Sequence, residues 1–169
     1  QKVERLLATT TEAEARELFT LCSQDQWRYA RAKQELADGA WRDKIVPILY
    51  RPFDMRWTVY DRNVAVHRRE RISNHMLRPG NYSLITARSN KSQSVDHFFV
   101  AKGLQETKCG ERTTQSQGFP LWLYPRESGD LLDAGVREKS ANLAATFVDA
   151  LKQAIGSAET PENTLAFIY

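Results

Sequence analysis

The chain has 169 residues, of which 41% are hydrophobic and 27% are charged. This composition is typical of a single soluble, globular domain and not of a disordered chain. The longest nearly apolar run, residues 119–124, is too short for a transmembrane helix, which requires roughly 18 residues. The two cysteines, Cys22 and Cys109, form no CxxC motif. We therefore expect neither a disulfide framework nor a zinc site, and a reducing, cytoplasmic location.

The net charge of +3 is small, but the basic residues are unevenly distributed along the chain. Between residues 51 and 91 there are nine basic residues and three acidic ones, a local net charge of +6. A positive cluster suits a surface that binds a polyanion, because phosphate contacts release the counterions condensed on nucleic acid. Pairing of these arginines with nearby acids is the alternative interpretation.

The first 40 residues are predicted to be helical. Thr11 and Glu14 have the spacing of a capping box, and apolar residues follow at helical spacing. Asp25 can cap a second helix, and Gly39 is suited to end that helix in a left-handed conformation. We interpret residues 1–40 as a helical buttress for the rest of the chain.

Residues 44–125 are predicted to form a sheet-rich core. Residues 44–50 read as an edge strand or a bulged strand because a proline interrupts them, and residues 53–60 alternate in the two-residue repeat of a strand. After a turn, residues 64–67 can return as the second strand of a hairpin. The buried face of the alternating strand is expected to carry Phe53, Met55, Trp57 and Val59.

Further elements complete this core. A short amphipathic helix fits residues 70–77, with Ile72 among the residues that face inward. Residues 82–88 and 95–101 read as strands, and residues 103–118 read as a long hydrophilic segment.

The last part of the chain, residues 140–169, is predicted to be helical. Asn142 is placed to cap one helix and Gly156 to end it, while Thr160 and Pro161 start another. Helices at both ends of a strand-rich centre indicate a single α+β domain over the whole chain. We expect a central mixed or antiparallel sheet that includes a hairpin.

Catalytic motifs are mostly absent from the sequence. It contains no glycine-rich phosphate loop and no G-x-S-x-G motif. Asp96, followed by Glu106 and Lys108, resembles the Asp…Glu-x-Lys pattern in which two carboxylates hold magnesium in a nuclease. The surrounding segment is polar, however, so a solvated loop is the favoured interpretation over a half-buried catalytic strand.

Two peptides are the most specific in the chain: YRPFDMRW at residues 50–57 and FPLWLYP at residues 119–125. Together with SLITARS between them and the closing LAFIY, they resemble the segment after the methyltransferase domain of type ISP restriction-modification enzymes. These are single-polypeptide, ATP-dependent enzymes, and similar segments occur in related single-chain DNA adenine methyltransferases. The resemblance implies a target-recognition domain, which binds double-stranded DNA and reads a short sequence while another domain methylates an adenine.

The resemblance also implies where the chemistry lies. S-adenosylmethionine, ATP and magnesium belong to other parts of such an enzyme, and the adenine-methylation motif is missing from this chain. We therefore expect a segment of a longer polypeptide with no catalytic residue, metal or cofactor of its own. Its expected partners are DNA and the methyltransferase domain of the same polypeptide.

Base reading requires Arg, Lys, Asn, Gln or similar side chains on an element that enters a groove, and loops often supply them. The YRPFDMRW peptide is instead expected to be scaffold, in which Asp54 pairs with Arg51 or Arg56 and Trp57 is buried. The predicted DNA contacts are Arg68, Arg69, Arg71, Asn90, Lys91, Gln93, Arg112, Thr114, Gln115 and Gln117.

Two alternatives to DNA recognition remain open at this point. The first is a structural coupling domain, whose basic surface would pack against acidic surfaces of the methyltransferase domain. The second is the magnesium-dependent nuclease suggested by Glu106 and Lys108.

Overall fold

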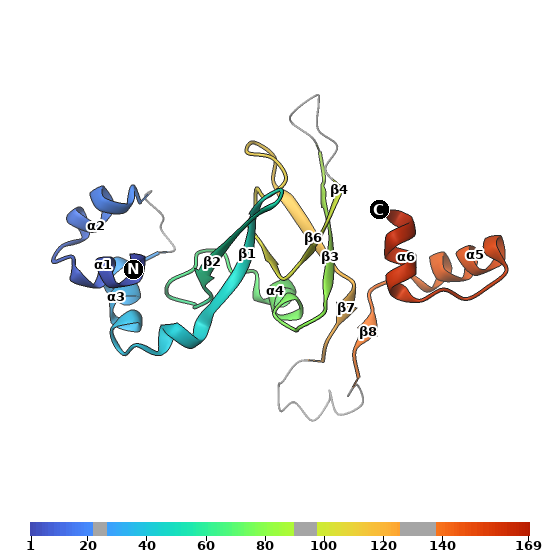
Figure 1. Ribbon diagram of the computed structural model, residues 1–169, viewed down its shortest axis with the longest axis horizontal. Coiled ribbons are helices and arrows are strands. Elements are labelled where there is room, and N and C mark those ends of the chain that lie inside the picture. Colours follow the sequence, from blue (N-terminus) through green and yellow to red (C-terminus); the bar gives the residue numbers. More distant parts are fainter. Residues whose placement is uncertain (22–26, 90–97, 126–137) are drawn as a thin grey trace. The chain divides into compact units, whose positions relative to one another are not determined.

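The fold is α+β, as predicted from the sequence. Helices occur at both ends of the chain, and the region between them contains three small sheets (Figure 1). The chain divides into two compact units. The first comprises Gln1–Val46 with Trp57–Arg69, and the second Pro47–Arg56 with Glu70–Tyr169. The computed structural model describes residues 1–21, 27–89, 98–125 and 138–169.

The first unit is mainly helical. Its core contains Leu36, Trp41 and Val59, all buried, and apolar side chains of the first helix pack against them. Burial of these large side chains is the main favourable term for this unit, because apolar surface leaves water. The helical elements are α1 (Lys2–Ala8), α2 (Glu12–Phe19), α3 (Tyr29–Ala37) and the 3-10 helix η1 (Ala40–Lys44).

The predicted capping box at the start of α2 is present. The Glu14 amide donates to Thr11 Oγ1 at 3.2 Å, and the Glu14 carboxylate accepts from the Thr10 amide at 2.7 Å. Gly39 adopts the predicted left-handed conformation, with φ of 83°, and η1 begins directly after it. Asp25, the predicted cap of the next helix, lies outside the described residues.

The first sheet has the strand order β2-β1-β5. It is formed by β1 (Ile45–Arg51), β2 (Asp54–Val59) and β5 (Leu104–Gln105), and β5 runs parallel to β1. The predicted return strand over residues 64–67 is wrong, because β2 itself is the hairpin partner of β1. Residues 64–67 are turns; the amides of Val64 and Ala65 donate to the carbonyl of Asp61.

The predicted burial of the β2 face is also wrong. Phe53 is fully exposed, and the exposed fractions of Met55 and Trp57 are 51% and 73%. Phe53 lies in the turn before β2, with φ of 63°, so it does not belong to the strand face. For Met55, Trp57 and Val59 the alternation does not determine which face the rest of the protein covers. Only Val59, at the end of β2, is buried as expected.

The second sheet has the order β4-β3-β6, and both of its strand pairs are antiparallel. Strands β3 (Tyr82–Ala87) and β4 (Phe98–Lys102) confirm the predicted strands in this region. Strand β6 (Ser116–Pro120) begins inside the segment that was expected to be only hydrophilic. Its two sides do not separate by polarity, since Ser116 and Pro120 are buried while Gln117 and Phe119 are exposed.

Helix α4 (Glu70–Met76) packs against β6 in the second unit. Met76 is buried, with 5% exposed, but Ile72 is 40% exposed, so its predicted inward orientation is wrong. A two-stranded sheet of β7 (Trp122–Leu123) and β8 (Ser140–Ala141) follows in the chain.

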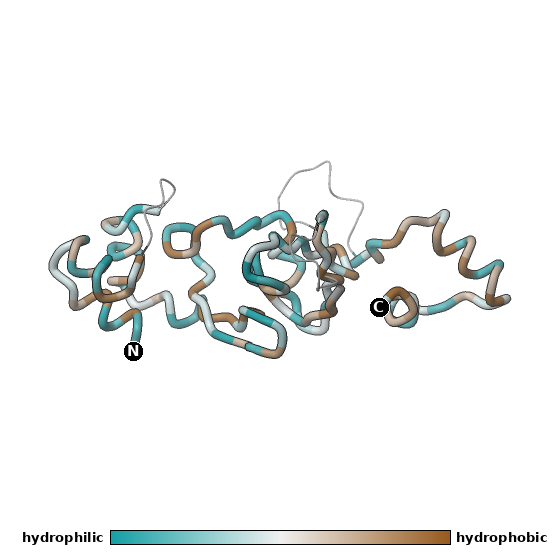
Figure 2. Tube along the Cα trace, turned by 90° about the horizontal axis from the view of Figure 1, so that it is seen from above, coloured by the Kyte–Doolittle hydropathy of each residue, from teal (hydrophilic) through white to brown (hydrophobic). Residues whose placement is uncertain are grey.

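The C-terminal region contains α5 (Ala145–Ile155) and α6 (Pro161–Ile168). Gly156 ends α5 with φ of 78°, and Thr160 caps α6 by accepting from the Asn163 amide, both as predicted. The predicted helix cap at Asn142 is wrong, because this residue is used by the sheet: its side chain donates to the carbonyl of Pro120 at 2.9 Å. Hydrophobic residues continue along α6 to the end of the chain (Figure 2).

Candidate nucleic-acid interface

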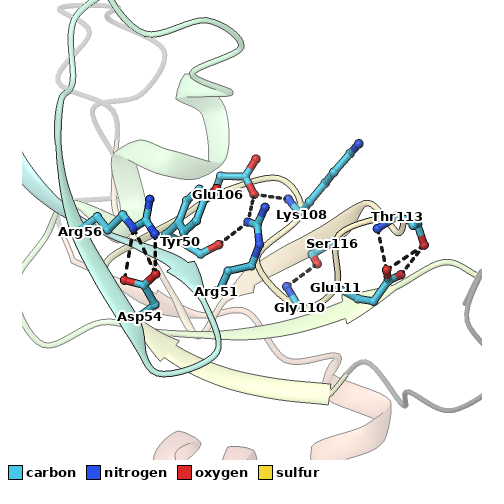
Figure 3. Close-up of polar contacts among 10 residues, drawn as sticks. All are labelled: Tyr50, Arg51, Asp54, Arg56, Glu106, Lys108, Gly110, Glu111, Thr113 and Ser116. Atoms are coloured by element: carbon cyan, nitrogen blue, oxygen red, sulfur yellow. Dashed lines mark hydrogen bonds and ion pairs between the residues drawn. The ribbon is translucent and has the colours of Figure 1, made fainter. Parts of the chain in front are cut away.

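The arginines at the tip of the β1–β2 hairpin are occupied by acids. Arg51 Nη1 lies 2.8 Å from Glu106 Oε2, and Arg56 Nη2 lies 2.9 Å from Asp54 Oδ2 (Figure 3). Both guanidinium groups also lie over the ring of Tyr50, at 4.1 and 3.6 Å from its centroid. Positive charge at this tip is therefore largely compensated within the protein.

One of the two pairings that the sequence favoured for Asp54 is present, the one with Arg56. The Asp54 carboxylate accepts from Arg56 Nε as well as Nη2, which raises the pKa of the guanidinium above its usual value. Arg51 pairs across the sheet instead, with Glu106 next to β5. The scaffold role of these residues stays a prediction, but their partners are now defined.

The segment between β5 and β6 folds around its own acids. The Glu111 carboxylate accepts from the amide of Thr113 at 2.6 Å (Figure 3). It also accepts from the hydroxyl of Thr114 at 2.6 Å. At the other end of the segment, Ser116 Oγ accepts from the Gly110 amide at 3.3 Å. These bonds give the loop a defined conformation, because the Glu111 carboxylate and the Ser116 hydroxyl accept hydrogen bonds from its backbone amides.

The predicted DNA contacts in this segment divide by exposure. Thr114 is 2% exposed and its hydroxyl is bonded to Glu111, so it is a structural residue and its predicted DNA contact is withdrawn. Arg112, Gln115 and Gln117 are exposed. Gln117 lies in β6, and Gln115 directly precedes the strand.

The Glu106-x-Lys108 pattern has a different use from the one a nuclease requires. Glu106 Oε2 accepts from Arg51 and from the Lys108 amide, at 2.8 Å each. The Lys108 ammonium points away from that carboxylate (Figure 3). Asp96 lies outside the described residues, and within the described ranges no group of three or more His, Cys, Asp or Glu could hold a metal.

The arginines before and within α4 fall into different compact units. Arg68 and Arg69 belong to the first, where Arg68 lies 5.3 Å from the ring centroid of Tyr60 and Arg69 is exposed with φ of 48°. Arg71 belongs to the second and is exposed on α4. The predicted contacts Asn90, Lys91 and Gln93 lie outside the described residues.

A buried asparagine holds the C-terminal end of α4 in place. Asn81 is 1% exposed, and its amide nitrogen donates to the carbonyls of His75 and Trp122 at 3.0 and 2.9 Å. Its side-chain oxygen accepts from the amides of Tyr82 and Trp122 at 2.9 and 3.0 Å. One side chain thus joins α4, β3 and β7 through four hydrogen bonds.

A second bond to α4 comes from the imidazole of His75. His75 Nδ1 accepts from the backbone amide of Tyr124 at 3.0 Å. Since an accepting Nδ1 carries no proton, the neutral ring has its hydrogen on Nε2. Together with the burial of Met76, these contacts fix α4 against the sheet.

Beside the predicted Arg71, the outer side of α4 and the turn after it carry two polar residues that the sequence analysis missed, Asn74 and Arg78. Arg71, Asn74 and Arg78 are exposed; Arg71 and Asn74 have the i, i+3 spacing of one helical face, and Arg78 follows in the turn after the helix. They line an open cavity of about 620 Å³, to which Tyr124 and Pro125 contribute the other wall. The spacing was present in the sequence, and it could have identified this face once the helix had been placed.

The chain belongs to the family of type ISP C-terminal specificity domains, whose model matches residues 1–169. It is also similar in structure to one chain of the cryo-EM structure of the DrdV–DNA complex, with a TM-score of 0.59 and 15% sequence identity. That similarity covers 99% of the present chain but 16% of the DrdV chain, so the domain spans about a sixth of its structural relative. A search of curated proteins found no match. None of the helices in the described part is long and apolar enough to span a membrane.

Proposed function

We propose that this domain binds double-stranded DNA and recognises a short target sequence for a larger restriction-modification enzyme. The observation that carries the proposal is membership of the specificity-domain family over the full length of the chain. The local excess of basic residues supports it, as does the similarity of fold to a protein whose structure was determined with DNA. Methylation and restriction would be carried out by other domains of the same polypeptide.

Two kinds of contact are required for this function. Phosphate contacts position the domain and supply most of the salt-dependent affinity, whereas contacts to base edges provide specificity. The exposed residues Arg69, Arg71, Arg112, Gln115 and Gln117 retain their predicted role as DNA contacts. Arg68 also keeps its predicted role as a DNA contact. Its cation–π contact with Tyr60 would support the guanidinium group in that role.

The proposal can be tested by duplex binding at several salt concentrations. The chain is mixed with fluorescent duplexes of random sequence, and bound duplexes are selected and sequenced over several rounds. We expect log Kd to rise linearly with log salt, by about 0.9 per neutralised phosphate, and the selected pool to share a short sequence. A chain that is folded by circular dichroism but binds no duplex at low salt would contradict the proposal for this domain by itself.

Structural coupling to the methyltransferase domain is a second candidate function. The observation that favours it is the hairpin tip, where Phe53 is fully exposed next to arginines that are already paired with acids. Met55 and Trp57 of the same hairpin are exposed as well, and a group of exposed apolar side chains is typical of a protein interface rather than of a DNA contact. Charge reversal of Arg68, Arg69 and Arg71 distinguishes the two functions: coupling predicts disturbed assembly with an unchanged methylation site, and recognition predicts a changed site.

A further inference from the structure

We propose that α4 is the element of this domain that enters a DNA groove, with Asn74 reading a base and Arg71 and Arg78 holding phosphates beside it. The inference rests on the proposed function and adds the residues that determine specificity. It is based on the geometry of the polar face, on the way α4 is fixed, and on the contrast with the other arginines of the second unit.

The geometry of the face suits a DNA groove. Arg71 and Asn74 lie three residues apart on α4, and Arg78 lies two residues beyond the end of the helix, so Asn74 is between the two arginines along the chain. A helix with its side chains is roughly 10–12 Å in diameter, which fits a major groove of about 12 Å in width. The central position is thus closest to the floor of a groove, and the two flanking arginines reach toward its rims.

The chemistry of the three side chains divides in the same way. An asparagine amide offers one donor and one acceptor side by side, which match N7 and N6 of adenine in the major groove. Arginine guanidinium groups are planar donors that bind phosphate oxygens in pairs. The open cavity of about 620 Å³ beside the helix leaves room for a sugar–phosphate backbone against Tyr124.

The attachment of α4 makes this face a rigid platform. Asn81 binds the carbonyl of His75 from inside the protein, and the His75 ring accepts from the Tyr124 amide. These bonds act on the inner side of α4 and on its C-terminal end. A reading side chain on a fixed element loses less conformational freedom on binding, which favours both affinity and specificity.

Two other arginines of the second unit, Arg51 and Arg56, are less suitable. Arg51 and Arg56 each have a carboxylate partner within 3 Å, and DNA would have to displace Glu106 or Asp54 to bind them. Among the ion pairs of the described residues, none involves Arg71. Phosphate binding by Arg71 therefore does not require an internal ion pair to break.

The experiment compares variants of the chain in the selection assay described above. Asn74→Asp keeps the shape of the side chain but removes its donor, so adenine loses its match and cytosine, which offers a donor at N4, gains one. We expect the preferred base at one position of the selected sequence to change, with about tenfold weaker binding to the original target. Asn74→Ala should relax the preference at that same position. Urea unfolding midpoints equal to that of the unchanged chain verify that both variants are folded.

The arginine variants test the phosphate contacts. Arg71→Ala and Arg78→Ala should each weaken binding to every duplex to a similar extent and reduce the salt slope by about 1. Arg56→Ala is the matched control, because its guanidinium is paired with Asp54, and it should leave the slope unchanged.

The outcomes separate the two proposals. Selection of the same sequence with the same discrimination by folded Asn74→Asp and Asn74→Ala would overturn the role of Asn74. Unchanged salt slopes for Arg71→Ala and Arg78→Ala would overturn the placement of α4 on DNA. In both cases the unchanged chain still binds DNA. Absence of binding by the unchanged chain contradicts the proposed function itself.

Discussion

The tip of the β1–β2 hairpin and the outer face of α4 both carry arginines, but these arginines are held very differently. At the hairpin tip, Arg51 and Arg56 are paired with Glu106 and Asp54. On α4, the protein fixes the helix from inside, through Asn81, and leaves the face with Arg71 exposed. The comparison shows that the number of arginines in a stretch does not locate a polyanion site, since their acidic neighbours decide how much charge is available.

The core of the first unit is buried, whereas the β1–β2 hairpin carries exposed side chains. Substitution of one tryptophan in each region tests how much burial contributes to stability. Trp41→Ala should lower the free energy of unfolding by roughly 3 to 5 kcal/mol, because its side chain is 6% exposed and its removal leaves a cavity. Trp57→Ala should cost less than about 1 kcal/mol, because its side chain is 73% exposed. Urea denaturation of both variants measures the difference. Equal losses would mean that the outer face of β2 is packed after all.

Substitution of the buried Asn81 should loosen the attachment of α4 in the second unit. Asn81→Ala removes four hydrogen bonds and leaves buried backbone groups without partners, so we expect a loss of about 3 kcal/mol or more in unfolding free energy. Duplex affinity should fall as well, at a temperature where the variant is still folded. Gln115→Ala, at an exposed position, is the control and should stay within about 0.5 kcal/mol. A stable Asn81→Ala variant would show that α4 is held by packing alone.

Low pH should weaken the contacts of Asp61 at the end of the β1–β2 hairpin that lies away from its tip. Asp61 accepts from Lys44 Nζ at 2.7 Å and from the Asn63 amide at 2.7 Å. Burial acts to raise the pKa of Asp61, but these bonds outweigh it and the pKa lies below its usual value. Because the folded-state pKa is the lower one, the stabilisation is complete above the unfolded pKa of about 3.9 and is lost as the pH falls through the folded value.

Denaturation as a function of pH checks this assignment. We expect the unfolding free energy of the unchanged chain to decrease as the pH falls below about 4, and Asp61→Asn to show a flatter dependence in the same range. Asp54→Asn, which removes an exposed carboxylate, is the control and should follow the unchanged chain closely. An unaltered acid dependence in Asp61→Asn would assign the effect to other carboxyl groups.

The smallest expected effect concerns the compensated charge at the hairpin tip. Glu106→Gln removes the half-exposed partner of Arg51, so the unfolding free energy should fall by about 1 kcal/mol or less. If the tip lies away from DNA, the salt slope of duplex binding should not change. A slope that increases by about 1 would mean that the released Arg51 binds a phosphate, and the contrast between the two regions would disappear.

Much of the local structure could be predicted from the sequence. The capping box at Thr11 and Glu14, the left-handed glycines at 39 and 156, and the cap at Thr160 depend on bonds between near neighbours in the chain. The strands over residues 82–87 and 98–102 were also recognisable, because short-range patterning sets their character. The α+β class and the family follow from the same kind of information.

The tertiary structure decided which surfaces are covered and which charges are available. The alternation in residues 53–59 grouped Trp57 with its neighbours on one face, but only packing determines whether such a face is buried. Arg51 and Glu106 are far apart in the chain, and the parallel pairing of β1 with β5 brings them together. Likewise, Asn81 holds α4 through bonds to His75 and Trp122 that no local pattern reveals. Contacts between distant residues depend on the path of the whole chain, and for this domain they separate a compensated hairpin from an exposed helix.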